Sequence, residues 1–269
     1  RVVLNQITDA FHIVHGPIGC ASYTWDIRGS LSSGEETYRT SFSTDLRETD
    51  VIFGGEKKLS AAIDELVARE KPKLIFVYAT CIVGVIGDDV EAVCKKAEEK
   101  YGIRVIPVKA AGFSGTKTLG YKLAGQAIMQ LIEPNKNIEK KNGVNILGDF
   151  NLAGEMWIIK NYLEKIGIPV ISTITGDSSY ETLMNAPSAT LNIVQCAGSS
   201  TYLANLMEEK LSIPYIKVSF FGIEDTTSSL IRIAEAMNNK EAVEKAKVFL
   251  KNQTEKVIPI IEQYKSRLK

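Results

Sequence analysis

The sequence predicts an α/β fold made of two Rossmann-like domains, each with a parallel sheet flanked by helices. Short apolar runs rich in strand-forming residues alternate along the chain with segments of helical periodicity. This alternation is typical of βαβ units, whose strands run parallel. The polar segment from Glu133 to Asn142 interrupts it. We therefore expect one domain over residues 1–137 and a second over residues 138–269.

The first domain is irregular before residue 50 and regular after it. We expect a short helix from Val3 to Ile13, followed by a loop that holds Cys20 and its neighbouring glycines. Gly54-Gly55 then precedes a helical segment, and a βαβ unit follows in which Gly102 ends the helix. The predicted helices are 57–69 and 90–101, and the predicted strands are 73–78 and 103–108.

The second domain repeats the same pattern. A glycine, Gly167, caps its first helix, and Gly198-Ser199-Ser200 opens its second. The predicted strands are 144–148, 168–171, 190–195 and 213–218, and the predicted helices are 153–166, 198–210 and the charged segment 241–269.

Composition limits the function classes. Among 269 residues, 32 Lys and Arg balance 32 Asp and Glu, which gives no reason to propose a nucleic-acid or membrane-surface partner. Neither a signal peptide nor an apolar run long enough to cross a bilayer is present, so we expect a cytoplasmic protein. Because the chain starts without Met and ends in a charged helix, we expect it to be part of a longer protein.

Two of the four cysteines occupy equivalent positions. Cys81 and Cys196 each follow an apolar strand and precede a helix, and the crevice at the carboxyl ends of parallel strands is where open α/β sheets bind ligands. A helix N-terminus also favours the thiolate, which is the form that binds iron or attacks an electrophile. The alternative is that both are small buried apolar residues.

The other two cysteines differ from each other. Cys20 lies among glycines that let the backbone approach a neighbouring group closely, although a tight turn with a chance cysteine explains the pattern equally well. Cys94 falls at helical spacing with Val90, Val93 and Ala97, which predicts a place in the core. The four cysteines contain no CxxC pair, so their spacing does not indicate a zinc site.

The remaining polar motifs are weaker. Gly54-Gly55 before a helix is compatible with an anion site, but a turn explains it better. Asp88-Asp89 is compatible with a cation site, but acidic residues in a first helical turn are favoured by the helix dipole. His12 and His15 lack the companions of a triad or a zinc site in sequence, so we expect packed or hydrogen-bonded side chains. Asp149 and Asp177 are candidates for a polar role at a sheet edge.

Four stretches in the same order resemble nitrogenase component-1 α-type chains. They are HGPIGCASYTWDIRGSLSSG (15–34), FSTDLRETDVIFGGEKKL (42–59), CIVGVIGDDVEAV (81–93) and LNIVQCAGSSTYLANLMEEKLSIPYIKVSFFG (191–222). The resemblance extends over essentially the whole chain. Within this family, the run WDIRGSLSSG and the segment GFSGTKTLGYKLAG (112–125) indicate the branch of scaffold subunits that build the iron–molybdenum cofactor.

The resemblance implies a three-domain fold, of which this chain matches the first two domains. It implies that Cys20 and Cys81 ligate an iron–sulfur cluster at a subunit interface, with a further cysteine ligand upstream of Arg1. It also implies that Cys196 lies near the cofactor precursor and that Arg28 lines the same pocket. The implied partners are a homologous β-type scaffold subunit, in a heterotetramer, and the nitrogenase iron protein. We expect neither cluster to be retained by these residues alone.

Two positions depart from the catalytic members of the family. Where catalytic α-type chains carry a glutamine and a histidine beside the cofactor, this sequence has Lys117 and Tyr121. The departure favours cofactor assembly over catalysis by nitrogenase or a related iron–sulfur oxidoreductase. Lys117 is suited to attract a polyanionic cluster or homocitrate, and the alternative is a surface lysine on a helix. A two-domain binding module of the periplasmic type is a third possibility, which the lack of a secretion signal and the cysteines at strand ends oppose.

Overall fold

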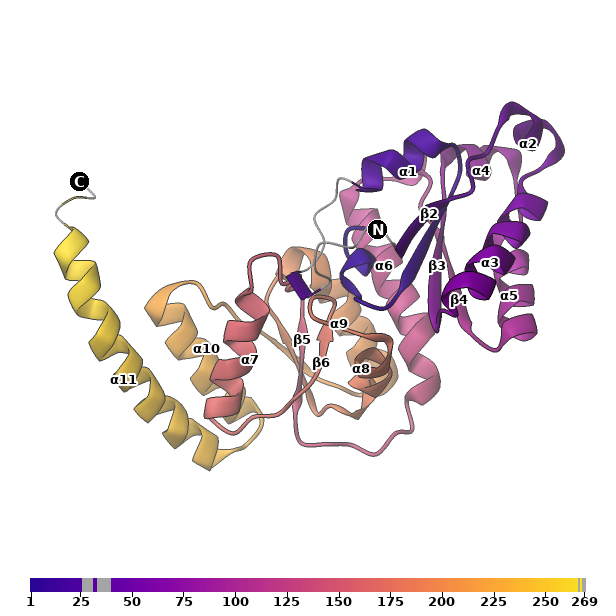
Figure 1. Cartoon of the computed structure of the whole chain (residues 1–269). Coiled ribbons are helices and arrows are strands. Elements are labelled where there is room, and N and C mark those ends of the chain that lie inside the picture. The colour runs from indigo at the N-terminus through magenta and orange to yellow at the C-terminus, as the bar shows by residue number, and fades with distance from the viewer. Residues whose placement is uncertain (26–30, 33–39, 266, 268–269) are drawn as a thin grey trace.

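The computed structural model describes residues 1–25, 31–32, 40–265 and 267, and these form two parallel four-stranded sheets (Figure 1). The predicted α/β class with two parallel sheets is thus confirmed. The first sheet has the order β2-β1-β3-β4, with β1 (Phe11–His15), β2 (Ser41–Ser43), β3 (Leu74–Ala79) and β4 (Arg104–Lys109). The second has the order β6-β5-β7-β8, with β5 (Val144–Leu147), β6 (Val170–Ile174), β7 (Leu191–Val194) and β8 (Tyr215–Lys217).

Helices connect and flank the strands. In the first half they are α1 (Ile18–Trp25), α2 (Glu48–Phe53), α3 (Glu56–Glu70), α4 (Cys81–Ile86), α5 (Val90–Tyr101) and α6 (Lys117–Ile132). In the second half they are α7 (Glu155–Lys165), α8 (Tyr180–Asn185), α9 (Ala197–Leu211), α10 (Gly222–Ala236) and α11 (Lys240–Lys265). Within the described ranges, no helix combines the length and the apolar character that crossing a bilayer requires.

The two sheets have the same strand order. In each, the second strand in sequence adds to one side of the first, and the chain then crosses to the other side for the third and fourth. The order therefore reverses between β1 and β3 in one sheet and between β5 and β7 in the other. Such a reversal opens a crevice at the carboxyl ends of the two strands, where ligands bind in open α/β sheets.

The helix predicted from Val3 to Ile13 is wrong. A short 3-10 turn occupies Leu4–Gln6, and residues Phe11–His15 form β1, which pairs with both β2 and β3. The two histidines interrupt an otherwise strand-like run, but both are buried and hydrogen-bonded, so β1 tolerates them inside the sheet. The loop expected around Cys20 is also partly wrong, because Cys20 lies in the first turn of α1.

The elements predicted after residue 50 are present, with β6 at Val170–Ile174 instead of 168–171, whereas helices α6, α8 and α10 were not predicted. Caps explain where the predicted elements end. Helix α5 starts at Asp89, whose carboxylate accepts a hydrogen bond from the Ala92 backbone N–H at 3.0 Å. It ends at Gly102, which adopts a left-handed φ of 65°. Val90, Val93, Cys94 and Ala97 face the core, as their spacing predicts.

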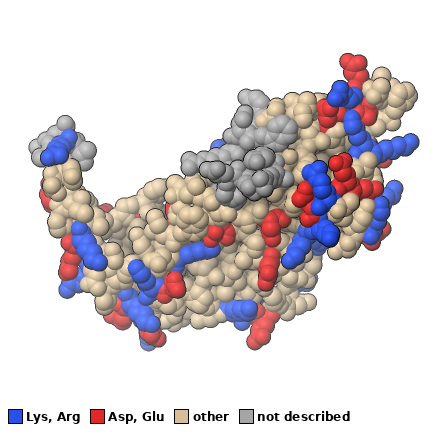
Figure 2. Space-filling model, in the orientation of Figure 1, with Lys and Arg blue, Asp and Glu red and all other residues tan. Residues whose placement is uncertain are grey.

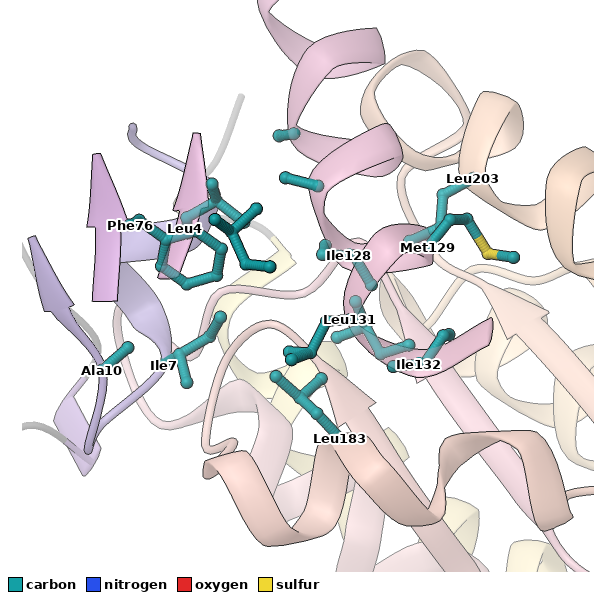
Figure 3. Close-up of a cluster of buried hydrophobic side chains, with 14 of the residues drawn as sticks. Leu4, Ile7, Ala10, Phe76, Ile128, Met129, Leu131, Ile132, Leu183 and Leu203 are labelled. Carbon is teal, nitrogen blue, oxygen red and sulfur yellow. The ribbon is translucent and has the colours of Figure 1, made fainter. Parts of the chain in front are cut away.

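One apolar cluster connects the two halves of the molecule. Helix α6 lies between them and presents Ile128, Leu131 and Ile132 to this cluster (Figure 3). On the side of the first sheet the cluster contains Leu4 and Phe76, and on the side of the second it contains Leu183 and Leu203. Burying apolar side chains from both halves in one cluster favours a fixed relation between the two sheets. Helix α11 extends away from the second sheet (Figure 1).

Candidate functional site

Cys20 and Cys81 lie at the switch point of the first sheet. Strands β1 and β3 are neighbours, with His15 opposite Ala79 at their carboxyl ends. Cys20 follows β1 in the first turn of α1, and Cys81 is the first residue of α4 after β3. Both thiols are free and exposed. The chain therefore presents two unpaired thiols at the sheet edge where ligands bind in this class of fold.

The backbone around Cys81 is suited to a thiolate. Cys81 starts α4, where the helix dipole favours negative charge, although α4 is only 6 residues long. The Gly112 N–H donates a hydrogen bond to Cys81 Sγ at 3.0 Å. A Cβ atom at Gly112 would lie 3.2 Å from that sulfur, so glycine permits this approach. No local pattern in the sequence marks this donor, because Gly112 lies 31 residues after Cys81.

Cys196 lies at the switch point of the second sheet. It follows β7 and is the N-cap residue of α9, and its thiol is exposed. Gly148, which follows the neighbouring β5, has a φ of 87°, and a Cβ atom there would lie 2.9 Å from the Cys196 backbone nitrogen. A cavity of about 690 Å³ opens beside Cys196, and its other lining residues include Phe150, Gln195 and Phe221.

Lys117 and Tyr121 lie close to Cys196. They occupy the first turns of α6, which packs on α9. The Lys117 ammonium lies 5.4 Å from the centre of the Tyr121 ring. The Tyr121 hydroxyl raises the pKa of Lys117, and the Cys196 thiol adds to this effect. The structure thus places three of the four expected residues on two packed helices, α6 and α9, although Lys117 and Tyr121 do not line the cavity beside Cys196. The fourth, Arg28, lies outside the described residues.

Asp149 provides a buried carboxyl group beside the same cavity. It follows β5, is only 3% exposed, and accepts a hydrogen bond from the Asn151 N–H at 2.7 Å. Burial raises the pKa of Asp149 from its ordinary value of 3.8 to about 6, against the opposing effect of the Asn151 hydrogen bond. Asp177 is placed differently, because its carboxylate pairs with Lys160.

The raised pKa of Asp149 predicts a pH-dependent stability. Between pH 3.8 and about 6, folded Asp149 holds a proton that the unfolded chain has released. The contribution of Asp149 to the free energy of unfolding should therefore fall by about 3 kcal/mol as pH rises through this window, and level off above it. Asp149→Asn should lack this decrease, as urea unfolding between about pH 4 and pH 7 would show. Parallel curves for parent and variant would contradict the prediction.

The weaker motifs have structural roles. The Gly55 N–H at the start of α3 donates to the Asp88 carboxylate at 3.0 and 3.1 Å, which agrees with a turn at Gly54-Gly55. Asp89 caps α5, as expected for an acidic residue at a helix start, whereas Asp88 also pairs with His15. His12 and His15 are both buried and hydrogen-bonded, as predicted. Cys94 is buried in the core.

A metal at these sites would need ligands beyond those placed here. Among the residues that the structure describes, no three His, Cys, Asp or Glu side chains gather closely enough to hold a metal ion. Iron–sulfur clusters are usually held by four thiolates. The exposed pair Cys20 and Cys81 supplies two of the four thiolates that such a cluster usually needs.

Comparisons with known proteins agree on one family. The family model described as nitrogenase component 1 type oxidoreductase matches residues 1–269. The chain is 67% identical over 269 residues to the nitrogenase iron-molybdenum cofactor biosynthesis protein NifE of Clostridium pasteurianum, covering 100% of this chain and 59% of that protein. It is 51% identical over 280 residues to NifE of Methanosarcina barkeri, covering 100% of this chain and 60% of that protein.

The fold agrees with a solved structure. Nitrogenase Cp1 at pH 6.5 superposes with a TM-score of 0.90 at 36% identity, covering 98% of this chain and 52% of that chain. The chain thus spans less than two thirds of the relatives it matches. Similarity along the whole length of the chain, in sequence and in fold, leads to one assignment. The chain belongs to the nitrogenase component 1 type oxidoreductase family.

Proposed function

We propose that this chain is part of a scaffold subunit on which the iron–molybdenum cofactor is assembled. The observation that carries the proposal is its 67% identity over all 269 residues to a NifE protein. The division into residues 1–137 and 138–269 then assigns the interfacial cluster to the first domain and the cofactor precursor to the second. The alternative is a catalytic α-type subunit, which Lys117 and Tyr121 oppose at the positions where catalytic chains carry glutamine and histidine.

Cys20 and Cys81 are the proposed ligands of the interfacial iron–sulfur cluster. They are unpaired, exposed and at the carboxyl ends of adjacent strands, and the Gly112 N–H supports the Cys81 sulfur. When bound, such a cluster would supply one-electron redox chemistry. The chain itself would hold two thiolates at the carboxyl ends of β1 and β3. A β-type partner subunit of the NifN kind would then supply the remaining cluster ligands.

Cys196, Lys117, Tyr121 and Arg28 are the proposed contacts of the cofactor precursor. Cys196 offers a sulfur ligand at the start of α9, and Lys117 offers a positive charge next to it. Lys117 is exposed, so its charge would attract a polyanionic cluster or homocitrate most strongly at low ionic strength. The cavity of about 690 Å³ beside Cys196 is lined by Asp149 and Glu155 and by no described Lys or Arg, so the positive charge for such a group would come from outside this lining.

An exposed apolar surface supports a protein partner at the edge of the first sheet. Ile52 and Phe53 end α2, Val85 lies on the adjoining α4, and Phe113 packs beside Gly84 of α4. These four side chains are 73%, 85%, 71% and 66% exposed. Clustered apolar groups of this exposure mark interaction sites. The proposed partners are the β-type subunit and, as electron donor, the nitrogenase iron protein.

Neither a nucleic acid nor a membrane is among the proposed partners. On the face shown in Figure 2, Lys and Arg side chains are interspersed with Asp and Glu, in line with the equal totals of 32 and 32. We propose a cytoplasmic location, since three exposed, unpaired cysteines suit a reducing compartment.

The interface predicts that the partner protects Cys20 from alkylation. The full-length chain should react with iodoacetamide at Cys20 when it is alone, and at least about tenfold more slowly in the complex with its β-type partner, because the covered thiol reacts only when the interface opens. Peptide mass spectrometry measures the rate of Cys20 alkylation. Lys247, an exposed lysine on α11 that is labelled separately by an amine reagent, serves as the reference site. Unchanged Cys20 labelling in a proven complex would contradict the proposed interface.

A further inference from the structure

His15 is buried beneath the edge that carries Cys20 and Cys81. Its side chain is 0% exposed and lies at the carboxyl end of β1, five residues before Cys20. Its Nδ1 lies 3.0 Å from Thr44 Oγ1, and its Nε2 lies 3.2 Å from Asp88 Oδ2. The imidazole therefore joins a residue that follows β2 to a residue that follows α4.

The same two partners reach the segments around the cysteines. Thr44 Oγ1 also accepts the Gly16 N–H at 3.0 Å, at the start of the turn into α1. Asp88 also accepts the Gly55 N–H. The His15 carbonyl oxygen accepts the Thr80 hydroxyl at 2.8 Å and the Thr80 N–H at 3.2 Å, directly before Cys81. One residue thus anchors both cysteine-bearing turns.

One tautomer of neutral His15 gives both ring nitrogens a hydrogen-bond partner. A neutral ring with its proton on Nε2 donates to Asp88 and accepts the Thr44 hydroxyl proton at Nδ1, so each donor meets one acceptor. Burial lowers the pKa of His15, and the hydrogen bond to Asp88 opposes this effect, as do the more distant Asp50 and Glu56 carboxylates. The ring is therefore uncharged at neutral pH and joins Thr44 to Asp88 by hydrogen bonds.

The residues around His15 are closely packed, so its side chain and the two turns have little room to move. A Cβ atom at Gly16 would lie 2.3 Å from Thr80 Oγ1, so the turn before Cys20 is in close contact with the residue before Cys81. A Cβ atom at Gly55 would lie 2.7 Å from Asp88 Oδ2 and 3.0 Å from His15 Cε1. Because interiors this closely packed deform little, a change at His15 is transmitted to both turns.

We propose that His15, held by Asp88, is a positioning residue that sets the two cysteine-bearing turns relative to each other before any cluster binds. This inference rests on the proposed function, because it takes Cys20 and Cys81 as the ligands. The His15 imidazole acts through Thr44 on Gly16, in the turn before Cys20, and through Asp88 on the segment after α4. The hydrogen bonds from Thr80 go to the His15 backbone carbonyl, which every residue at this position provides.

His12 provides a matched control. It lies on the same strand, is also 0% exposed, and bonds to one hydroxyl, with its Nδ1 2.9 Å from Tyr78 Oη. It stacks on Phe76 and Tyr78, on the opposite face of the sheet from His15. Asparagine at either position therefore removes a buried imidazole from β1, but only at position 15 does this break the side-chain link between Thr44, beside the turn into α1, and Asp88, after α4.

Hydrogen exchange of the metal-free full-length chain tests the positioning. His15→Asn retains an amide near the place of Nδ1 but cannot reach Asp88, so exchange in residues 16–25 and 80–87 should accelerate at least about tenfold. His15→Gln places an N–H near Nε2 and should restore most of the protection. Asp88→Ala, which removes the acceptor of both the His15 Nε2–H and the Gly55 N–H, should act like His15→Asn. Equal acceleration in His12→Asn and His15→Asn would overturn the proposal, as would unchanged exchange.

The assembled complex provides the second measurement. With the β-type partner present and the cluster reconstituted, His15→Asn should alter the electron paramagnetic resonance spectrum of the cluster, whereas His12→Asn should leave it unchanged. Suppose that His15→Asn accelerates exchange but leaves the spectrum unaltered, while Cys81→Ser removes the cluster. This result would overturn the positioning role of His15 and leave the proposed function intact. A cluster that survives Cys81→Ser would refute the ligand assignment instead, and with it the positioning role.

Discussion

Cys81→Ser in the full-length chain, assembled with its partner subunit, should remove most of the iron and sulfide of the interfacial cluster while the complex stays folded. Serine keeps the size of the side chain but replaces the thiolate, and iron–sulfur clusters depend on thiolate ligands. Because Cys81 is exposed, the substitution should change the free energy of unfolding by no more than about 0.5 kcal/mol. Iron and acid-labile sulfide assays together with thermal melting separate these two effects.

A neighbouring residue provides the control for Cys81. Val85 is 71% exposed on the same helix, so Val85→Ser changes the same surface without removing a sulfur. The Val85→Ser complex, where it assembles, should keep its cluster. Full iron content in the Cys81→Ser complex would show that this thiol is not a ligand, and the two-cysteine site at the first switch point would then have to be abandoned.

Cys196→Ala and Cys94→Ala should have opposite effects. Cys196 is exposed at the start of α9, so its loss should leave the free energy of unfolding within about 0.5 kcal/mol of the parent but strongly reduce precursor-associated iron. Cys94 is 1% exposed, and burial raises the pKa of its thiol to about 12, so it is a neutral core residue at neutral pH. Its truncation should destabilise the chain by about 1–2 kcal/mol and leave the iron unchanged.

Both variants are measured in the full-length complex, with melting temperature and iron determined on the same sample. A large drop in melting temperature with iron retained in Cys196→Ala would favour a structural role for this cysteine. Iron loss in Cys94→Ala without destabilisation would contradict the assignment of Cys94 to the core.

Periodicity and capping act locally, so the sequence predicts α5, α7, α9 and the later strands, but it did not lead us to α6, α8 or α10. Helix α5 has an apolar stripe, an acidic cap and a terminal glycine, all of which lie within one short segment. The strand β1 was missed because His12 and His15 break its apolar run. Their burial depends on Tyr78, Thr44 and Asp88, which come from other elements of the fold. Long-range partners of this kind leave no local pattern in the sequence.

The candidate site was predicted in part for the same reason. Cys81 and Cys196 stand out because each follows a strand, and the strand order then places them at corresponding switch points of the two sheets. Strand order arises from tertiary packing, so the sequence gives no direct sign that Cys20 shares an edge with Cys81. The Gly112 donor and the His15 anchor are likewise products of the fold.

Transfer of cofactor from the loaded complex tests the scaffold assignment most directly. The full-length chain and its β-type partner, loaded with the cofactor precursor and matured, are mixed with a nitrogenase component 1 that lacks its cofactor, and substrate reduction is measured with the iron protein and reductant. We predict that the mixture becomes active as iron and molybdenum move to the acceptor, and that the loaded complex alone reduces substrate at a negligible rate. Substrate reduction by the loaded complex alone, at a rate comparable to that of the activated acceptor, would contradict the scaffold assignment and establish the catalytic alternative.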